Sequence, residues 1–400
     1  MTELLLVGIG VTGRPYLDAC DGLGVGVRAV ETADVLAELG DRLVGGHPTA
    51  GQLDEAWAAA VEAAAAARQP EGVVAFADPQ VVGAALVQDR LGLPGPSLPA
   101  AVLSRNKALQ RGRFAARALP QPDHVLTDDL DAVAGWVAER LPVVVKPLSA
   151  SGSLGVELVS TAAGYRELCR RRGAEGALLV ERYAAGPEYS WEGLVEDGRI
   201  WFGNVTAKET TGPPGFVELV HRAAAELPEQ TAGQVAHLAA GTVAALGMRT
   251  GIVHLEFRVT AAGPRLLEVA VRTPGDRLLD VLELTYGFSW YEMVVRLALR
   301  MPLPPPPTGP PDRYAASCYL TARPGVLTAV EGLDELRAHP AVVRARVRLR
   351  PGHTVHPLRS SADRVGSLLL QAGSRDELEE ALAYARRTVR VLTAEVEGPA

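Results

Sequence analysis

Two glutamates in otherwise apolar strands constrain this chain more than any other feature. Residues 251–277 read as two short strands joined by a turn at 260–264. Each strand carries one glutamate among apolar residues, Glu256 in VHLEFRV and Glu268 in LLEVAV. Strand side chains alternate between faces, so Glu268 shares a face with Arg272. If the two strands pair across the turn, both carboxylates meet on one surface.

Two carboxylates on so apolar a surface need a cation, because burying charge without a partner is costly. Mg²⁺ fits this role, since it is a hard ion that prefers oxygen and is held by one or two carboxylates together with substrate phosphates. A half-buried strand with a solvated polar face has the same pattern. The sequence leaves both interpretations open at this point.

Composition bounds the class of protein. The chain has 400 residues, enough for two or three domains, and a net charge of −7, which argues against nucleic acid or an anionic membrane as the main partner. Its three cysteines, Cys20, Cys169 and Cys318, form neither a metal-binding spacing nor a disulfide framework, as expected in a reducing cytoplasm. The N-terminus has no positive region, and its apolar run is too short for a signal or membrane segment.

Residues 1–102 alternate strands with helices, which predicts an α/β domain with an open parallel sheet. Strands are expected at 4–8, 25–31 and 72–78, with helices at 52–68 and 81–91. The first strand runs into a G-x-G-x-x-G turn, the glycine spacing of dinucleotide-binding sites.

This glycine turn is weak evidence for a ligand when it stands alone. Ligands of open parallel sheets bind at the carboxyl ends of strands. Gly10, Thr12, Gly13, Arg14 and Asp78 would therefore line such a crevice. We interpret the glycines instead as allowing strand and helix to pack closely, and we do not predict NAD.

The middle of the chain contains a loop typical of phosphate binding. A helix is expected over 103–119, and a valine-rich strand ends on Lys146. Small residues at 148–155 follow before a strand resumes at 156–160. Such a flap can wrap phosphates with its backbone N–H groups. It is not a P-loop, because GxxxxGK[ST] is absent, and a solvent-exposed hairpin is the other interpretation.

Polar residues recur in the strands that follow. Glu181, Glu188 and Glu192 could accept hydrogen bonds from an adenosine, although their spacing alone favours a solvated edge. Asp197-Gly198 indicates a hairpin. Glu218 and His221 would share a face if their segment were helical. An amphipathic helix is expected over 230–246.

These pieces form an ordered set that resembles the ATP-grasp superfamily of carboxylate–amine ligases, and within it the L-amino-acid and dipeptide ligases. The resemblance rests on the phrases GPEYSWEGLVEDG, FVELVHRAAAELP, LGMRTGIVHLEF and EVAVRTPGD in this order. It implies an ATP-grasp fold: an N-terminal domain (1–102), an ATP-grasp core (103–302) with a lid at about 125–185, a proline-rich linker (303–311) and a C-terminal α+β module (312–400).

The resemblance also implies an activity and its ligands. The expected reaction is ATP-dependent amide formation between a small carboxylic acid and an amine, through an acyl-phosphate that releases ADP and phosphate. ATP and Mg²⁺ are the expected cofactors, with Mn²⁺ as an alternative ion. A cytoplasmic homodimer is expected, with neither nucleic acid nor membrane as partner.

Site residues follow from the same resemblance. Glu256 and Glu268 would bind Mg²⁺, and Arg272 would stabilise the acyl-phosphate and the tetrahedral intermediate. Lys107 and Lys146 would contact phosphates, Glu181 the adenine amino group and Glu188 the ribose. The lid and adenine edge would supply the remaining nucleotide contacts: Ser149, Ser151, Gly152, Ser153, Gly155, Tyr183 and Ala184. Six residues would line the substrate pocket: Glu218, His221, Thr273, Pro274, Gly275 and Asp276.

One position departs from the family pattern. The usual phrase at the second acid is Glu-x-Asn-x-Arg, whereas this chain has Ala270 in place of the asparagine, which is a metal ligand. Water can fill the vacant ligand position. Two other readings stay open: a carboxylase-type enzyme that activates bicarbonate, and an ATP-binding protein without turnover.

Arginines alternate along one predicted strand of the C-terminal module, at Arg344, Arg346, Arg348 and Arg350. We interpret them as keeping an edge strand soluble by like charge rather than as an anion site. A helix is expected over 375–392.

Overall fold

The N-terminal lobe is a parallel α/β sheet, as the sequence predicts. The structure is a computed structural model that describes residues 2–51, 53–173 and 175–395. Four parallel strands lie in the order β3-β2-β1-β4: β1 (Glu3–Val7), β2 (Gly26–Glu31), β3 (Gly45–Pro48) and β4 (Gly72–Ala75). Helical segments connect or flank them: α1 (Arg14–Leu23), α2 (Ala33–Leu39), η1 (Gly40–Arg42), α3 (Asp54–Ala67), α4 (Asp78–Leu91) and α5 (Leu98–Ser104).

Several predicted boundaries in this lobe are corrected. The third strand ends at Ala75, and Asp78 begins α4 instead of closing the strand. Gln52, the predicted start of α3, lies outside the described residues. The helix expected over 103–119 is two helices, because α5 ends at Ser104 and α6 (Lys107–Ala115) starts afresh. The side chain of Asn106 accepts the amides of the next turn, which makes it an N-cap.

The glycine-rich turn after β1 serves close packing. A Cβ at Gly13 would lie 2.7 Å from the carbonyl oxygen of Ile9, and one at Gly8 would overlap the side chain of Gln80. The Gly10 amide donates to the carboxylate of Glu31 over 2.9 Å. These contacts support the interpretation of the motif as a packing device.

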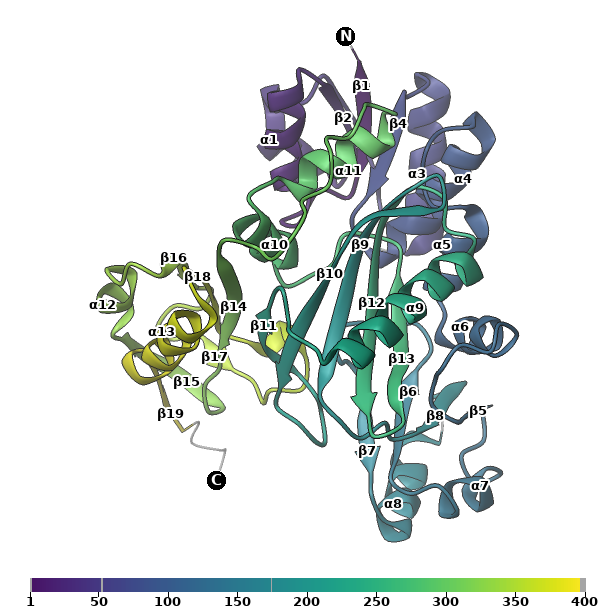
Figure 1. Ribbon diagram of the computed structural model, residues 1–400, viewed down its shortest axis with the longest axis vertical. Coiled ribbons are helices and arrows are strands. Elements are labelled where there is room, and N and C mark those ends of the chain that lie inside the picture. Colours follow the sequence, from purple (N-terminus) through teal and green to yellow (C-terminus); the bar gives the residue numbers. More distant parts are fainter. Residues whose placement is uncertain (1, 52, 174, 396–400) are drawn as a thin grey trace.

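A second lobe carries the small-residue loop. Its antiparallel sheet has the order β5-β8-β6-β7, built from β5 (His124–Thr127), β6 (Val143–Pro147), β7 (Glu157–Val159) and β8 (Leu178–Arg182). Helices α7 (Ala134–Ala138) and α8 (Ala162–Arg172) accompany it at the lower end of Figure 1. Strands β6 and β7 pair antiparallel on either side of residues 148–155, so the predicted strand–loop–strand is present.

The central sheet has eight strands and joins the core to the C-terminal module. Its order is β13-β12-β9-β10-β11-β14-β18-β16. The core supplies β9 (Glu188–Glu196), β10 (Arg199–Thr210), β11 (Glu218–Arg222), β12 (Gly251–Thr260) and β13 (Gly263–Ala270). Helix α9 (Glu229–Leu246) packs on β12 and β13, while α10 (Leu278–Tyr286) and α11 (Trp290–Ala298) lie toward the N-terminal lobe (Figure 1).

The C-terminal module continues this sheet. Strand β14 (Tyr314–Leu320) pairs directly with β11, and β18 (Gly366–Ala372) and β16 (Val342–Val347) extend the sheet beyond it. A small sheet of β15 (Gly325–Glu331), β17 (Thr354–Val355) and β19 (Arg390–Ala394) completes the module, with α12 (Leu333–Arg337), α13 (Arg375–Thr388) and the 3₁₀ turn η2 (Ser361–Asp363).

Strand β16 and helix α13 of the C-terminal module were both expected from the sequence. Strand β16, which carries Arg344 and Arg346, is an edge strand as predicted, but it ends at Val347, so the prediction that Arg348 and Arg350 belong to the same strand is wrong. Arg344 pairs with Asp280. The helix predicted over 375–392 is wrong at its end, because α13 stops at Thr388 and β19 follows. No helix in the described part of the chain is both long and apolar enough to cross a membrane.

A tryptophan covers a pair of glycines in the central sheet. Gly193 of β9 lies opposite Gly203 of β10, and the ring of Trp191 occupies the space above both. A Cβ at Gly193 would lie 1.9 Å from that ring, which is buried in the core shared with α9. The glycines make room for an aromatic side chain that a pleated sheet would otherwise exclude.

We therefore expect Gly193→Ala to destabilise the protein by about 1–3 kcal/mol through overpacking. The measurement is the urea midpoint of unfolding. Gly233→Ala is the matched control, because Gly233 is exposed within α9 with open space around it. It should stabilise by roughly 0.5–1 kcal/mol through helix propensity. Equal effects of both substitutions would contradict this account.

Candidate active site

A cleft of about 330 Å³ lies between the central sheet and the loop at 148–155. This volume falls in the range of small-molecule sites. Most predicted site residues line it: Lys107, Lys146, Ser151, Gly152, Ser153, Glu181, Tyr183, Ala184, Glu188, Glu218, His221, Glu256, Glu268, Arg272, Pro274, Gly275 and Asp276. Segments far apart in sequence therefore converge on one cavity.

Three predicted site residues do not line the cleft. The side chain of Thr273 is buried against the N-terminal lobe, where its hydroxyl lies 2.6 Å from that of Tyr16. Ser149 and Gly155 lie near the two ends of the loop and do not line the cavity, and the Gly155 carbonyl accepts from Arg172. The other three residues of the TPGD loop after Arg272 do face the cleft.

Glu256 and Glu268 lie directly opposite each other on β12 and β13. Directly opposed residues of antiparallel strands are neighbours on one face, so both carboxylates meet as predicted. Each is neutralised by a lysine. Lys107 Nζ lies 2.9 Å from Glu268 Oε1, and Lys208 Nζ lies 2.7 Å from Glu256 Oε1.

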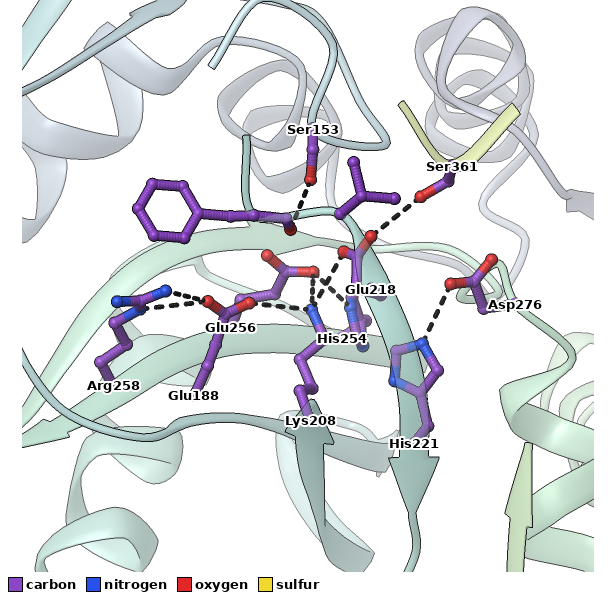
Figure 2. Close-up of polar contacts among 12 residues, drawn as sticks. Ser153, Glu188, Lys208, Glu218, His221, His254, Glu256, Arg258, Asp276 and Ser361 are labelled. Atoms are coloured by element: carbon purple, nitrogen blue, oxygen red, sulfur yellow. Dashed lines mark hydrogen bonds and ion pairs between the residues drawn. The ribbon is translucent and has the colours of Figure 1, made fainter. Parts of the chain in front are cut away.

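Lys208 is the centre of a buried charge network that sequence reasoning missed. Its side chain, on β10, is 1% exposed and also lies 3.5 Å from Glu188 and from Glu218 (Figure 2). Burial alone would lower the pKa of Lys208, but the three glutamates outweigh burial and raise it well above its usual value. Lys208 is the one lysine in the strand sequence RIWFGNVTAKET, and this isolated position could have indicated its role.

His254 ties the acid pair to a buried carboxylate. Its Nδ1 lies 3.0 Å from Glu192, and its Nε2 lies 3.2 Å from Glu256. Burial would lower the pKa of His254, but these hydrogen bonds raise it to about 9. Glu192 is fully buried and also accepts from Asn204 and Thr206. Glu256 is therefore paired with two cations, His254 and Lys208, and both stabilise its negative charge.

A second buried network lies at the root of the loop. The carboxylate of Glu181 receives Arg111 Nε at 2.5 Å and Lys146 Nζ at 2.7 Å, and all three side chains are nearly inaccessible. Burial would raise the pKa of Glu181, but these two cations lower it to about 2. Glu181 was predicted to accept from adenine. The structure shows that both of its oxygens already hold cations, and Arg111 was not predicted.

Glu188 is held by an arginine that was also missed. Arg258 of β12 donates to it through Nε at 3.0 Å and Nη2 at 2.8 Å, and its Nη1 donates to the hydroxyl of Tyr183. The guanidinium also lies over the ring of Phe216. Both nitrogens donate to the same oxygen, Oε2, so this charge-assisted pair holds in place the carboxylate that was predicted to contact the ribose.

Arg272 is oriented by the N-terminal lobe. Its Nε and Nη2 form a bidentate pair with Asp78 at 2.9 and 2.8 Å, and Nη1 donates to the Thr273 carbonyl. Asp78 is the first residue of α4, at the carboxyl end of β4. Asp78, which was predicted to line a crevice, thus holds Arg272, which was predicted to be catalytic.

Glu218 and His221 both face the cleft for a reason different from the one predicted. Their segment is strand β11, not a helix, and a regular strand would place residues three apart on opposite faces. A β-bulge resets the alternation, because Thr210 pairs with Glu218 while Glu209 pairs with Val220. His221 Nε2 lies 3.0 Å from Asp276 Oδ2.

The C-terminal module supplies two further residues that were not predicted. Arg364 pairs with both oxygens of Asp276 and donates to the Glu218 carbonyl. Burial would raise the pKa of Asp276, but Arg364 and His221 hold it well below its usual value. Ser361 donates its hydroxyl hydrogen to Glu218 over 2.8 Å (Figure 2).

The chemistry of the donor set fits Mg²⁺ that is shared with a nucleotide. Within residues 2–51, 53–173 and 175–395, no three acidic, histidine or cysteine side chains form a metal site by themselves. Glu256 and Glu268 offer two carboxylates on one face of a cavity that is also lined by Lys107 and Lys146. Mg²⁺ commonly takes one or two carboxylates and completes its shell with phosphate and water oxygens.

Comparisons with known proteins agree with this geometry. A family model described as the ATP-grasp domain matches residues 139–279. The chain contains an ATP-grasp domain over these residues. A second family model, described as the L-amino acid ligase C-terminal domain 2, matches residues 318–394. The resemblance stated from sequence motifs is therefore confirmed.

Individual relatives of the ATP-grasp protein include amide-forming ligases. Carnosine synthase 1 of Gallus gallus is 27% identical, over 87% of this chain and 40% of its own length. The L-arginine-specific L-amino acid ligase of Bacillus subtilis is 19% identical, over 79% of this chain and 78% of its own length. The chain spans 40–63% of the length of three of its curated relatives.

The fold has a close match among solved structures. The crystal structure of an L-amino acid ligase from Bacillus licheniformis superposes with a TM-score of 0.84, covers 99% of both chains and is 22% identical. This likeness shows that the chain has the fold of that structure.

The Glu181 network makes a prediction for acid stability. A carboxylate whose pKa is about 2 in the folded state contributes stability above its unfolded pKa of about 4.5, and that stability is lost as the pH falls toward 2. The contribution is about 3 kcal/mol at neutral pH. In Glu181→Gln, the deficit in unfolding free energy relative to wild type should therefore shrink between pH 5 and pH 2.

The measurement is urea unfolding at several pH values. Glu196→Gln is a suitable control, because Glu196 is exposed at the end of β9. A deficit that stays constant down to pH 2 would show that Glu181 is not held ionised by Arg111 and Lys146.

Proposed function

We propose that this protein is an ATP-dependent carboxylate–amine ligase that forms an amide bond and releases ADP and phosphate. The observation that carries the proposal is the opposed pair Glu256 and Glu268, which shares one cleft with Lys107 and Lys146. That combination suits charge neutralisation on a transferring phosphoryl group. Relatives that are named as amino-acid ligases and carnosine synthase support the reaction class.

ATP would lie with its phosphates toward the loop at 148–155 and its adenosine toward Tyr183 and Ala184. Ala150, Gly152 and Ser153 border the cleft on the loop side. Glu188 would accept from the ribose hydroxyls while Arg258 keeps its carboxylate in place. When bound, Mg²⁺ held by Glu256 and Glu268 would neutralise charge on the phosphates.

The first step is phosphoryl transfer to the acid. A carboxylate oxygen of the substrate attacks the γ-phosphorus of ATP, the bond to the β-phosphate oxygen breaks, and ADP leaves. Lys107 and Lys146 would compensate the negative charge on the phosphoryl oxygens. Since Lys146 is buried and its pKa is lowered by burial, its pairing with Glu181 helps to keep it charged.

The second step is amide formation. The amine nitrogen attacks the acyl carbon, Arg272 stabilises the oxyanion, and phosphate leaves as the amide forms. Burial would lower the pKa of Arg272, but Asp78 raises it, so the guanidinium stays charged and fixed.

The attacking amine must lose a proton, and His221 and Glu218 are the candidate bases. Asp276 lies next to His221 Nε2, and Nδ1 is buried without a hydrogen-bond partner among the described residues. The homodimer and the cytoplasmic location expected from the resemblance stay predictions.

The experiment that tests the proposal is phosphate release from Mg·ATP across a matrix of amino acids and small carboxylic acids, with ADP and AMP separated by chromatography. ADP that requires both an acid and an amine would support the ligase. AMP would rule out an acyl-phosphate. Stimulation by bicarbonate alone would indicate a carboxylase-type reaction, and ATP binding without release would indicate a protein without turnover.

With the true substrates present, Glu268→Gln and Arg272→Ala should each lower kcat by at least about 10²-fold, because each removes charge stabilisation at the reacting groups. The measurement is steady-state ADP formation at saturating ATP. Glu196→Gln is again the control and should retain full activity. Near-normal turnover in either active-site variant would overturn the role assigned to that residue.

A further inference from the structure

One segment of the C-terminal module enters the cleft from outside the ATP-grasp core. Ser361, the first residue of η2, lines the cleft together with the loop at 148–155 and with Glu218. Figure 2 shows it above the sheet, on the same side as Ser153, and pointing toward Glu218. It therefore stands at the boundary between the proposed lid and the proposed substrate pocket.

Ser361 makes one hydrogen bond to each side of that boundary. Its hydroxyl donates to Glu218 Oε2 over 2.8 Å. Its backbone N–H donates to the carbonyl oxygen of Gly152, at the tip of the loop, over 3.2 Å. One residue thus joins a substrate-pocket carboxylate to the lid.

The segment that carries Ser361 is well anchored. Asp363 Oδ2 accepts the backbone N–H and the hydroxyl of Ser360 at 2.8 and 2.9 Å. Arg364 donates to the Ser361 carbonyl and pairs with Asp276, and its guanidinium lies 3.6 Å from the ring centroid of Tyr319. An anchored donor can hold a loop, whereas a mobile one would move with it.

The two ends of the loop are tied to the rest of the structure, because the Leu148 carbonyl accepts from the Lys107 amide and the Gly155 carbonyl accepts from Arg172. Two further side-chain hydrogen bonds hold the stretch between these ends. Lys107 Nζ donates to the Ala150 carbonyl over 2.6 Å, and Ser153 Oγ donates to the Phe216 carbonyl over 3.1 Å. Leu154, at its tip, is 59% exposed. Since a single hydrogen bond contributes modestly in water, loss of one of these contacts changes the open population without unfolding the lobe.

We propose that Ser361 is a positioning residue that latches the lid to the C-terminal module. Its amide holds the loop at Gly152, and its hydroxyl sets the carboxylate of Glu218 in the substrate pocket. The lid and the pocket are therefore aligned through one residue of the module. The part of this inference that concerns the reaction rests on the proposed ligase function.

For a ligase, an open lid has a defined chemical consequence. Water that reaches the acyl-phosphate attacks the acyl carbon, phosphate leaves, and the carboxylic acid is regenerated. The net result is hydrolysis of ATP to ADP and phosphate without amide. A weakened latch should therefore raise the ratio of ADP to amide.

Two substitutions separate the two hydrogen bonds. Ser361→Ala removes the hydroxyl contact to Glu218 and keeps the amide contact to Gly152. Ser361→Pro removes both. Proline suits this position, because it is the first residue of a helical turn and the preceding Ser360 is extended, with φ −151° and ψ 167°.

Ala162→Pro is the matched control. Ala162 is the exposed first residue of α8, and the preceding Thr161 is likewise extended, with φ −136° and ψ 153°. It places a proline in an equivalent local structure, within the lobe that carries the loop but away from the cleft. It should behave as wild type in every assay below, and thermal unfolding confirms that each variant is folded.

The first readout does not depend on ligase activity. Chymotrypsin cleavage after Leu154, mapped by mass spectrometry in the presence of Mg·AMPPNP, measures lid opening. We expect cleavage about 3- to 10-fold faster in Ser361→Pro than in wild type, the size expected for loss of one hydrogen bond, and unchanged in Ser361→Ala. Equal rates in wild type and folded Ser361→Pro would overturn the latch.

The second readout is the ratio of ADP to amide with the true substrates. Ser361→Pro should raise the ratio about 3- to 10-fold, in step with lid opening. Ser361→Ala should raise KM for the substrate held by Glu218 with the ratio unchanged. A faster cleavage with no change in the ratio would overturn the proposed coupling to the reaction. If wild type forms no amide while Ser361→Pro still opens the lid, the ligase proposal fails and the latch stands.

Discussion

Compensation of buried charge is the constraint on which the rest of this structure depends. The cleft places several carboxylates in positions that water scarcely reaches, and a fixed cation lies beside each of them. Lys208 forms ion pairs with Glu256, Glu188 and Glu218. Lys146 and Arg111 form ion pairs with Glu181. Removing one partner of such a set leaves an uncompensated charge, which is far costlier than losing an exposed ion pair. Folding thus fixes the electrostatics of the cleft before any ligand arrives.

Because side chains alternate in a strand, the two acidic residues Glu256 and Glu268 of this network could be predicted from the sequence. Glu256 and Glu268 stand out because they interrupt apolar strands, and a short turn between them sets their pairing. Their cationic partners carry no such signal. Lys208 and Arg111 come from segments that are far away in sequence, and an arginine in a helix reads as a solvated residue until tertiary structure buries it.

Local irregularities account for what the sequence could not predict. The bulge in β11 brings Glu218 and His221 to one face, whereas their spacing alone placed them on one face only if the segment were helical. The cap at Asn106 divides a segment whose propensity is helical throughout. Ser361 enters the cleft through a loop of the C-terminal module, and its position depends on the pairing of β14 with β11. Bulges, caps and long-range pairing are set by hydrogen-bond geometry that residue spacing does not encode.

The continuous central sheet limits how this architecture can be divided. Strand β11 carries two residues of the cleft and pairs with β14 beyond the proline-rich linker. A fragment cut at that linker would retain β11 as an exposed edge with unpaired backbone groups, which is a template for aggregation. The linker is a boundary in sequence but not in hydrogen bonding. The smallest exchangeable unit, whether in evolution or in protein engineering, is therefore the core together with its C-terminal module.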